Sequence, residues 1–242
     1  MDIEKNDVDL TKLFLWSDEF PIVDRVGDEV TTVFIRLVGD KDLNRARIHG
    51  LRSSGELREK LHDKKSDEYI AFISGSNLTD RDKLAAGVKL LLMGELTNVA
   101  RKNVVAKIPK EPDSDADLEE HEKYQVAIDE FPAKFSELVV EEGDKLLQSE
   151  DKRMKKLSDE ELRGEYIELT INYVCQEEMN RSFTDMCAFL GTYTNAKMRK
   201  KYFRSFDIYE NIAPEVKNQL REHYQTLELG MSELKKSQEA TQ

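Results

Sequence analysis

The stretch from residue 158 to residue 191 constrains the fold more than any other part of the sequence. Its apolar side chains recur every three or four residues, and no proline interrupts them. Ser158 and Glu161 have the spacing of a capping box, in which each side chain accepts a hydrogen bond from the backbone of the other residue. Gly191 follows the last periodic residue, where a helix commonly ends. The stretch therefore predicts a helix of about nine turns and, with it, a mainly helical protein.

The composition agrees with helices whose outer faces are charged. Of the 242 residues, 36% are charged and 39% are hydrophobic, and there are only 11 glycines and 5 prolines. The formal net charge of -12 argues against nucleic acid as the general partner, because binding phosphates requires a surplus of Lys and Arg. The acidity is uneven, however, since residues 194–206 carry five bases and no acid.

The N-terminal part contains the clearest strand signal. Residues 30–38 are rich in β-branched side chains and have a Gly-Asp pair on either side, which is typical of a strand between turns. Residues 1–29 form an acidic arm, whose apolar cluster around Trp16 either packs onto the body or enters it as a strand. A helix is expected from about residue 40 to residue 61, with Ser53-Ser54-Gly55 as a possible interruption.

The next segments complete a small α/β unit. Residues 67–74 are too short a run for periodicity to distinguish a strand from a buried helix end. A helix is expected from about residue 79 to residue 103, so residues 30–106 are predicted to form one unit. Residues 107–117 contain two prolines and an acidic run, which predicts a linker.

Beyond the linker, residues 118–230 predict a helical region. Phe131-Pro132 is expected to break or kink its first helix. Residues 193–206 are expected to form a short basic-aromatic helix, and Pro214 stands where a last helix would begin. Residues 231–242 predict a polar tail. The predicted fold class is therefore mainly α, with a small α/β N-terminal unit followed by a helical C-terminal region.

The sequence contains no recognisable catalytic, metal or cofactor constellation. No serine sits in a Gly-x-Ser-x-Gly turn, and no glycine-rich phosphate loop is present. The acidic run 113–117 begins like a calcium loop but lacks the glycine and the final glutamate of such a loop. We therefore predict no catalytic residue, no metal site and no cofactor. The histidines stand in charged helical stretches, where a solvated side chain is the usual case: His49, His62, His121 and His223.

The two cysteines fall in the same predicted helix. Cys175 and Cys187 would lie about 18 Å apart along its axis, which is too far for a disulfide. Buried, reduced thiols are typical of a cytoplasmic protein. The N-terminus lacks the apolar core of a signal peptide, and the longest apolar runs are too short to span a bilayer. We expect a cytoplasmic protein that makes no membrane contact.

Two basic groups are candidate partner-binding sites. The first follows the early strand, and its helical spacing brings its members to shared faces, suited to an acidic segment of a partner or of the chain's own arm. The second is interleaved with aromatics, which suits single-stranded nucleic acid but is more often typical of an amphipathic helix with its aromatics in the core. The first group is Arg45, Arg47, Arg52 and Arg58, and the second is Lys197, Lys200, Lys201 and Arg204.

Two stretches resemble the tail assembly chaperones of tailed bacteriophages and related phage accessory proteins. They are Asp42-Leu43-Asn44-Arg45-Ala46-Arg47 after the early strand and the C-terminal Phe206-Asp207-Ile208-Tyr209-Glu210-Asn211-Ile212-Ala213-Pro214. The resemblance is one of general character over most of the chain and rests on no diagnostic motif. It implies an acidic, cytoplasmic, non-enzymatic protein that binds an aggregation-prone partner such as a tape-measure protein. In that family a longer form often arises by ribosomal frameshifting.

The sequence thus predicts a non-enzymatic interaction or assembly protein with a protein client. Two alternatives stay open at this level. One is a nucleic-acid-binding accessory protein that uses residues 197–206. The other is an enzyme whose active site is assembled from dispersed residues, which a single sequence does not reveal.

Overall fold

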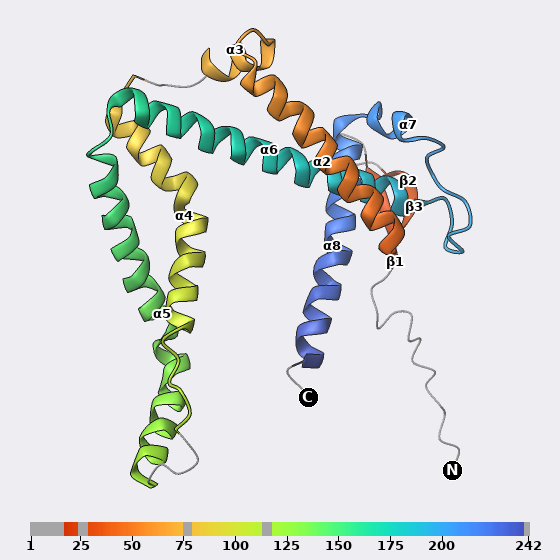
Figure 1. The fold of residues 1–242 in the computed structure, drawn as a ribbon. Helices are drawn as coiled ribbons and strands as arrows, with labels where there is room; N and C mark the ends of the chain where they lie inside the picture. The colour runs from red at the N-terminus through yellow and green to blue at the C-terminus, as the bar shows by residue number, and fades with distance from the viewer. Residues whose placement is uncertain (1–16, 24–28, 75–78, 113–117, 240–242) are drawn as a thin grey trace, which may run out of the picture. The chain divides into compact units, whose positions relative to one another are not determined.

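The computed structural model describes residues 17–23, 29–74, 79–112 and 118–239, with side chains described through residue 230 (Figure 1). Residues 13–16, the first part of the apolar cluster expected around Trp16, and the acidic run 113–117 lie outside the described residues, whereas residues 20–23, the second part of the cluster, belong to the first strand. In chain order the elements are β1 (Ser17–Val23), β2 (Glu29–Arg36), α2 (Asp40–His62), α3 (Asp67–Ser74), α4 (Arg81–Val105), α5 (Leu118–Met154), α6 (Asp159–Gly191), β3 (Thr192–Tyr193), α7 (Phe206–Glu210) and α8 (Pro214–Glu239).

The fold is mainly α with a small antiparallel sheet, which confirms the predicted fold class. The chain forms two compact units, of which the first combines residues 1–59 with residues 175–242 and the second consists of residues 60–174. Helix α6 contributes its first half to the second unit and its second half to the first. The units do not follow the consecutive segments 30–106 and 118–230, because the C-terminal strand and helices pack on the N-terminal sheet.

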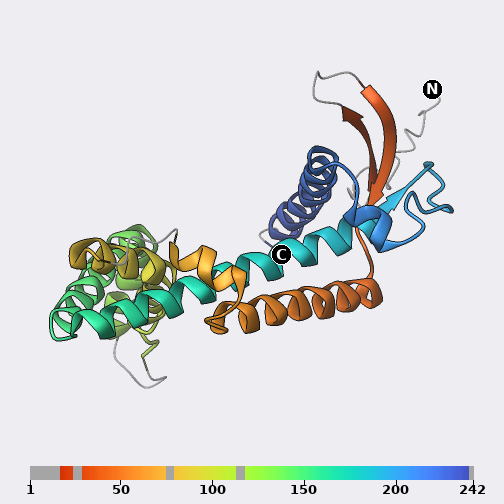
Figure 2. The ribbon, with the colours of Figure 1, turned by 90° about the horizontal axis from the view of Figure 1, so that it is seen from above.

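The core of the first unit forms around β2, the central strand of the sheet. β1 pairs with it in antiparallel register, with Ser17 opposite Arg36, and β3 pairs on its other side, with Thr192 opposite Ile35. Figure 2 shows β1 and β2 as a curved pair beside α8. Alternation along the strand turns Val33 and Ile35 inward, where they are 1% and 0% exposed. Their buried neighbours come from α6 and α8 and include Met186, Cys187, Leu220, Tyr224 and Leu227.

Helix α8 covers the outer edge of β1. The side-chain amide of Gln219 accepts a hydrogen bond from Val23 N–H at 2.9 Å and donates one to the Val23 carbonyl at 2.8 Å. One turn later, His223 donates to the backbone carbonyl of Pro21, and its ring stacks on Phe20 with 4.3 Å between centroids. Pro21 has no N–H to offer a further strand. This half of the edge is therefore closed to pairing with another chain.

The second unit contains an antiparallel pair of helices, α4 and α5. Arg81, in the first turn of α4, holds the end of α5: its Nη2 donates to the carbonyls of Met154 at 3.0 Å and Leu157 at 2.7 Å, and its Nη1 pairs with Asp159. Met154 ends α5 and Leu157 lies between α5 and α6, so the arginine ties this connection to α4; the Met154 carbonyl also accepts from Leu157 N–H at 3.2 Å. The small core beside this contact consists of Leu84, Val88, Met154 and Leu162.

Several local predictions are confirmed. Ser158 N–H donates to the Glu161 carboxylate at 2.7 Å, and Glu161 N–H donates to Ser158 Oγ at 3.2 Å, which is the expected capping box. Helix α6 ends at Gly191, and β2 occupies most of the strand predicted over residues 30–38. Residues 67–74 form helix α3, so the helical alternative holds over the strand, but no residue of this helix is buried.

Other local predictions were wrong. Residues 193–206 do not form a helix, because Tyr193 pairs with Phe34 in the sheet and the chain turns back so that Lys201 bridges to Tyr193. Of the two effects expected of Pro132, a break in the helix is excluded, because α5 is continuous from Leu118 to Met154. A proline removes one backbone donor from a helix, and a helix this long retains many others. The sequence Ser53-Ser54-Gly55 does not interrupt α2.

Replacing Gly50 tests the packing of α2 on α6. A Cβ at position 50 would lie 2.7 Å from the backbone carbonyl oxygen of Met179 and 3.3 Å from Cβ of Phe183. The helix would have to shift, so we expect Gly50→Ala to lower the free energy of unfolding by about 1–3 kcal/mol. Gly55→Ala is the matched control in the same helix, because nothing lies within 4 Å of its Cβ, and it should raise that free energy by about 0.5–1 kcal/mol. Urea unfolding measures both, and equal effects of the two substitutions would contradict the packing described.

The contact between α8 and β1 predicts a pH dependence of stability. Burial lowers the pKa of His223 from its ordinary value of 6.5, so the unfolded chain takes up a proton more readily than the folded one. The stability that neutral His223 contributes to the folded state is therefore complete above pH 6.5 and is lost as the pH falls below 6.5 toward the lowered pKa. We expect the thermal midpoint of the wild type to fall more between pH 7 and pH 5.5 than that of His223→Gln, which keeps a donor for Pro21. An identical slope in His223→Gln would refute the argument.

Candidate protein-interaction surface

Helix α2 presents an apolar strip to solvent. Its inner face is closed, since Ala46 is 0% exposed and Gly50 is buried against α6. On the opposite face Ile48 and Leu51 are each 61% exposed, and Gly55 is also exposed. With about 100° of rotation per residue, these three positions fall within about 60° of one another. The outward face of α2 is therefore apolar along its centre, where a surface helix is usually polar.

Arginines stand on both flanks of this strip. At about 100° per residue, Arg45 and Arg52 lie about 20° apart on one flank, and Arg47 and Arg58 lie about 20° apart on the other. All four side chains are exposed. The ion pairs formed among the described residues do not include Arg45, Arg47 or Arg52. The arginines predicted from the sequence thus share one helix face, which we call the α2 surface: Arg45, Arg47, Ile48, Leu51, Arg52, Gly55 and Arg58.

The second predicted group does not form a comparable surface. Lys197, Lys200 and Arg204 are exposed on the loop between β3 and α7. The ammonium group of Lys201 is instead used within the fold: it donates to the Leu190 carbonyl and, at 2.7 Å, to the hydroxyl of Tyr193.

The aromatics of the same loop are unequally available. Phe203 is 6% exposed and belongs to the core of the first unit, whereas Tyr202 is 39% exposed. Phe206 packs against that core and stacks on Tyr209 with 5.7 Å between centroids. A binding site for single-stranded nucleic acid stacks successive bases on exposed rings. Tyr202 is therefore exposed enough for such stacking, whereas Phe203 and Phe206 pack in or against the core.

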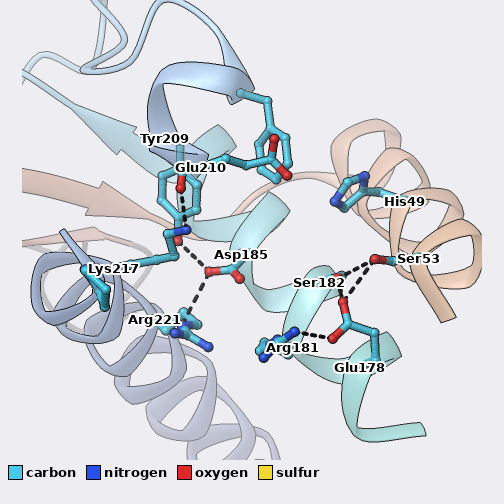
Figure 3. Close-up of a pocket in the computed structure, with 12 residues that line it drawn as sticks. His49, Ser53, Glu178, Arg181, Ser182, Asp185, Tyr209, Glu210, Lys217 and Arg221 are labelled. Atoms are coloured by element: carbon cyan, nitrogen blue, oxygen red, sulfur yellow. Dashed lines mark hydrogen bonds and ion pairs between the residues drawn. The ribbon is translucent and has the colours of Figure 1, made fainter. Parts of the chain in front are cut away.

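A polar cavity that the sequence did not reveal lies within the first unit (Figure 3). It measures about 340 Å³ and is bounded by α2, α6, α7 and α8. Its members stand far apart in the chain and belong to no motif, so no signal in the sequence joins them. The charged and titratable side chains that line it are His49, Glu178, Arg181, Asp185, Tyr209, Glu210, Lys217 and Arg221.

Asp185 organises one side of the cavity. It accepts a hydrogen bond from the hydroxyl of Tyr209 at 2.7 Å and lies 3.3 Å from Nε of Arg221. The Tyr209 side chain is fully buried, and this burial, with the negative charge of Asp185, raises the pKa of its hydroxyl. The tyrosine therefore stays protonated as a donor and joins α7 to α6. The contact is structural, because a hydroxyl with a raised pKa does not serve as a base at neutral pH.

Glu178 organises the other side. It accepts hydrogen bonds from the hydroxyls of Ser53 at 3.0 Å and Ser182 at 2.7 Å, and Arg181 pairs with its second carboxylate oxygen. The two serine hydroxyl oxygens lie 3.0 Å apart. Figure 3 shows these side chains converging between α2 and α6. The network fixes α2 against α6 on the face opposite the α2 surface.

The thiols and the possible metal ligands offer no reactive centre in the described part of the chain. Cys175 and Cys187 are buried and unpaired, as predicted. Burial raises the pKa of both thiols, that of Cys187 to about 12, so neither ionises readily. Within residues 17–23, 29–74, 79–112 and 118–230, no three His, Cys, Asp or Glu side chains are grouped so that they could hold a metal ion. In the same part of the chain, no helix has the length and apolar character needed to cross a bilayer.

The chain was compared with family models, with curated proteins and with solved structures. No family model, curated protein or solved structure matches it.

The buried thiols predict slow chemical modification. In the folded protein at pH 8, we expect 5,5′-dithiobis(2-nitrobenzoic acid) to label neither Cys175 nor Cys187 within minutes, because burial both blocks access and disfavours the thiolate. Unfolding in guanidinium should expose both thiols and release two equivalents of the yellow product. Rapid labelling of one thiol in the folded protein would show that its segment of α6 opens.

Proposed function

We propose that this protein is a non-enzymatic interaction protein that binds an acidic, amphipathic helical segment of a client on the α2 surface. One observation carries the proposal: Ile48 and Leu51 are each 61% exposed between two pairs of exposed arginines. An amphipathic helix laid against such a strip would cover the apolar centre and place its carboxylates beside the arginines. The site of action that we propose is the cytoplasm.

The expected free energies of binding indicate that the apolar strip and the arginines must act together. Covering the two exposed aliphatic side chains contributes about 2–4 kcal/mol, whereas a micromolar complex requires about 8 kcal/mol. Charge-assisted hydrogen bonds from arginine to carboxylate contribute about 1.5–3 kcal/mol each where water is excluded. The proposed complex therefore needs an acidic partner and weakens as salt is added.

Two features support helix docking over other modes of recognition. The edge of β1 is partly closed by Gln219 and His223, which disfavours a partner that adds a strand. The second basic group uses Lys201 within the fold and keeps Phe203 in the core, which disfavours a nucleic-acid site built on stacking. The resemblance to phage tail assembly chaperones implies that the client is a virion structural protein with long helices.

The α2 surface predicts a charge-dependent loss of the partner. We expect Arg45→Glu with Arg52→Glu to reduce recovery of the client, in affinity purification from the native cell, by at least about tenfold, because each reversal places a carboxylate beside the acidic segment. Recovery with the wild type should fall as NaCl rises from 0.1 M to 0.5 M. Ile48→Ser with Leu51→Ser should have a similar effect while leaving the thermal midpoint nearly unchanged, since both side chains are exposed.

A charge-matched control separates the surface from net charge. Arg101→Glu with Lys102→Glu changes the charge equally at exposed positions of α4 and should retain the client. A client that is lost equally from both double variants, or kept by both, would refute the proposal. Recovery of nucleic acid that disappears with Lys197→Glu and Lys200→Glu would instead favour the nucleic-acid alternative.

A further inference from the structure

In the polar cavity of the first unit, Glu178 and Asp185 contact neighbouring side chains, and three cations keep N–H donors beyond those that their contacts use. Glu178 accepts from Ser53 and Ser182 and pairs with Arg181. Asp185 accepts from Tyr209, and the side chains of both carboxylates are only 16% exposed. These contacts, of which those of Asp185 use Oδ1, join α6 to α2, α7 and α8.

The cations of the cavity retain donors. A lysine ammonium has three N–H donors and a guanidinium has five. Among the described residues, the Lys217 ammonium donates to the Glu210 carbonyl at 2.8 Å, and one Nη of Arg181 pairs with Glu178. The Arg221 guanidinium donates to Asn218 at 2.5 Å, and its buried Nε lies 3.3 Å from Oδ1 of Asp185, an ion pair outside hydrogen-bonding geometry. Each of the three cations therefore keeps at least one N–H donor that no contact among the described residues uses.

We propose that this cavity binds a small oxyanion, presenting a phosphate or a carboxylate group to Arg181, Lys217 and Arg221. Both anions offer the several acceptor oxygens that such donors need. Figure 3 shows the three cationic side chains along α6 and α8 and His49 across the cavity on α2.

The volume and the aromatic wall limit the size of the ligand. At about 340 Å³ the cavity is at the small end of ligand sites, which suits an anion carrying a short carbon body. The rings of His49 and Phe206 meet edge to face with 4.7 Å between centroids and line part of the cavity wall with aromatic carbon.

Local charge limits the affinity. The three cations are balanced by Glu178, Asp185 and Glu210, so binding depends on the placement of donors rather than on a net positive field. An affinity in the range of about 0.1–10 mM follows from two or three charge-assisted hydrogen bonds that replace contacts with water.

The test is a titration of the full chain with inorganic phosphate and, separately, with citrate. Isothermal titration calorimetry at constant ionic strength, set with NaCl, should show saturable binding of at least one of the two. Arg181→Gln and Lys217→Gln should each weaken it by about tenfold, as expected for the loss of one charge-assisted hydrogen bond. Arg101→Gln, at an exposed residue of α4, is the matched control and should bind as the wild type does.

The outcomes are distinct. Binding of phosphate alone, or of citrate alone, supports the proposal and names the anion. The absence of saturable binding for both anions, or binding that both cavity variants retain, overturns it. Lys217 also holds the Glu210 carbonyl, so Arg181→Gln, whose side chain is 61% exposed, keeps the test decisive if Lys217→Gln perturbs α7. The α2 surface takes no part in this experiment, so a failure here leaves the proposed function standing.

Discussion

The pairing of β3 with β2 holds the first unit together, because it joins parts of the chain that are far apart in sequence. Arg36, at the end of β2, donates to the hydroxyl of Tyr193 at 2.9 Å across a separation of 157 residues. The Arg36 guanidinium and the Lys201 ammonium both stand over the Tyr193 ring, at 5.1 Å and 4.2 Å from its centre, and add cation–π attraction. Closing so long a loop costs entropy. The buried apolar contacts made on closure must offset that cost.

The same closure requires a glycine at the end of α6. A Cβ at Gly191 would lie 2.5 Å from the backbone oxygen of Arg36 and 3.3 Å from the ring of Tyr224. The absence of a side chain lets the end of the helix approach the central strand closely enough for β3 to follow without a loop. Gly191 thus ends the helix and also permits the contact between helix and sheet.

The orientation of the α2 surface follows from these constraints. Helix α2 begins at Asp40, four residues after β2 ends at Arg36, so the position of the sheet determines where the helix starts. Gly50 allows its inner face to approach Met179, and Ser53 joins the Glu178 network on that side. The residues that fix the helix are small and polar, and the strip of Ile48 and Leu51 is left on the outside. The proposed docking face and the polar cavity are therefore two results of one packing arrangement between α2 and α6.

The sequence by itself determined the features that depend on neighbours along the chain. The capping box at Ser158, the end of α6 at Gly191, the strand before α2 and the inert thiols all follow from local spacing and periodicity, as does the arrangement of the arginines on one helix. Only the tertiary structure decided that residues 193–206 are not helical, because pairing with β2 and burial of Phe203 outweigh their helical spacing. It also decided the division into units and brought Ser53, Asp185, Tyr209 and Arg221 to one cavity. These features depend on contacts between distant segments, whose free energy leaves no periodic trace in a single sequence.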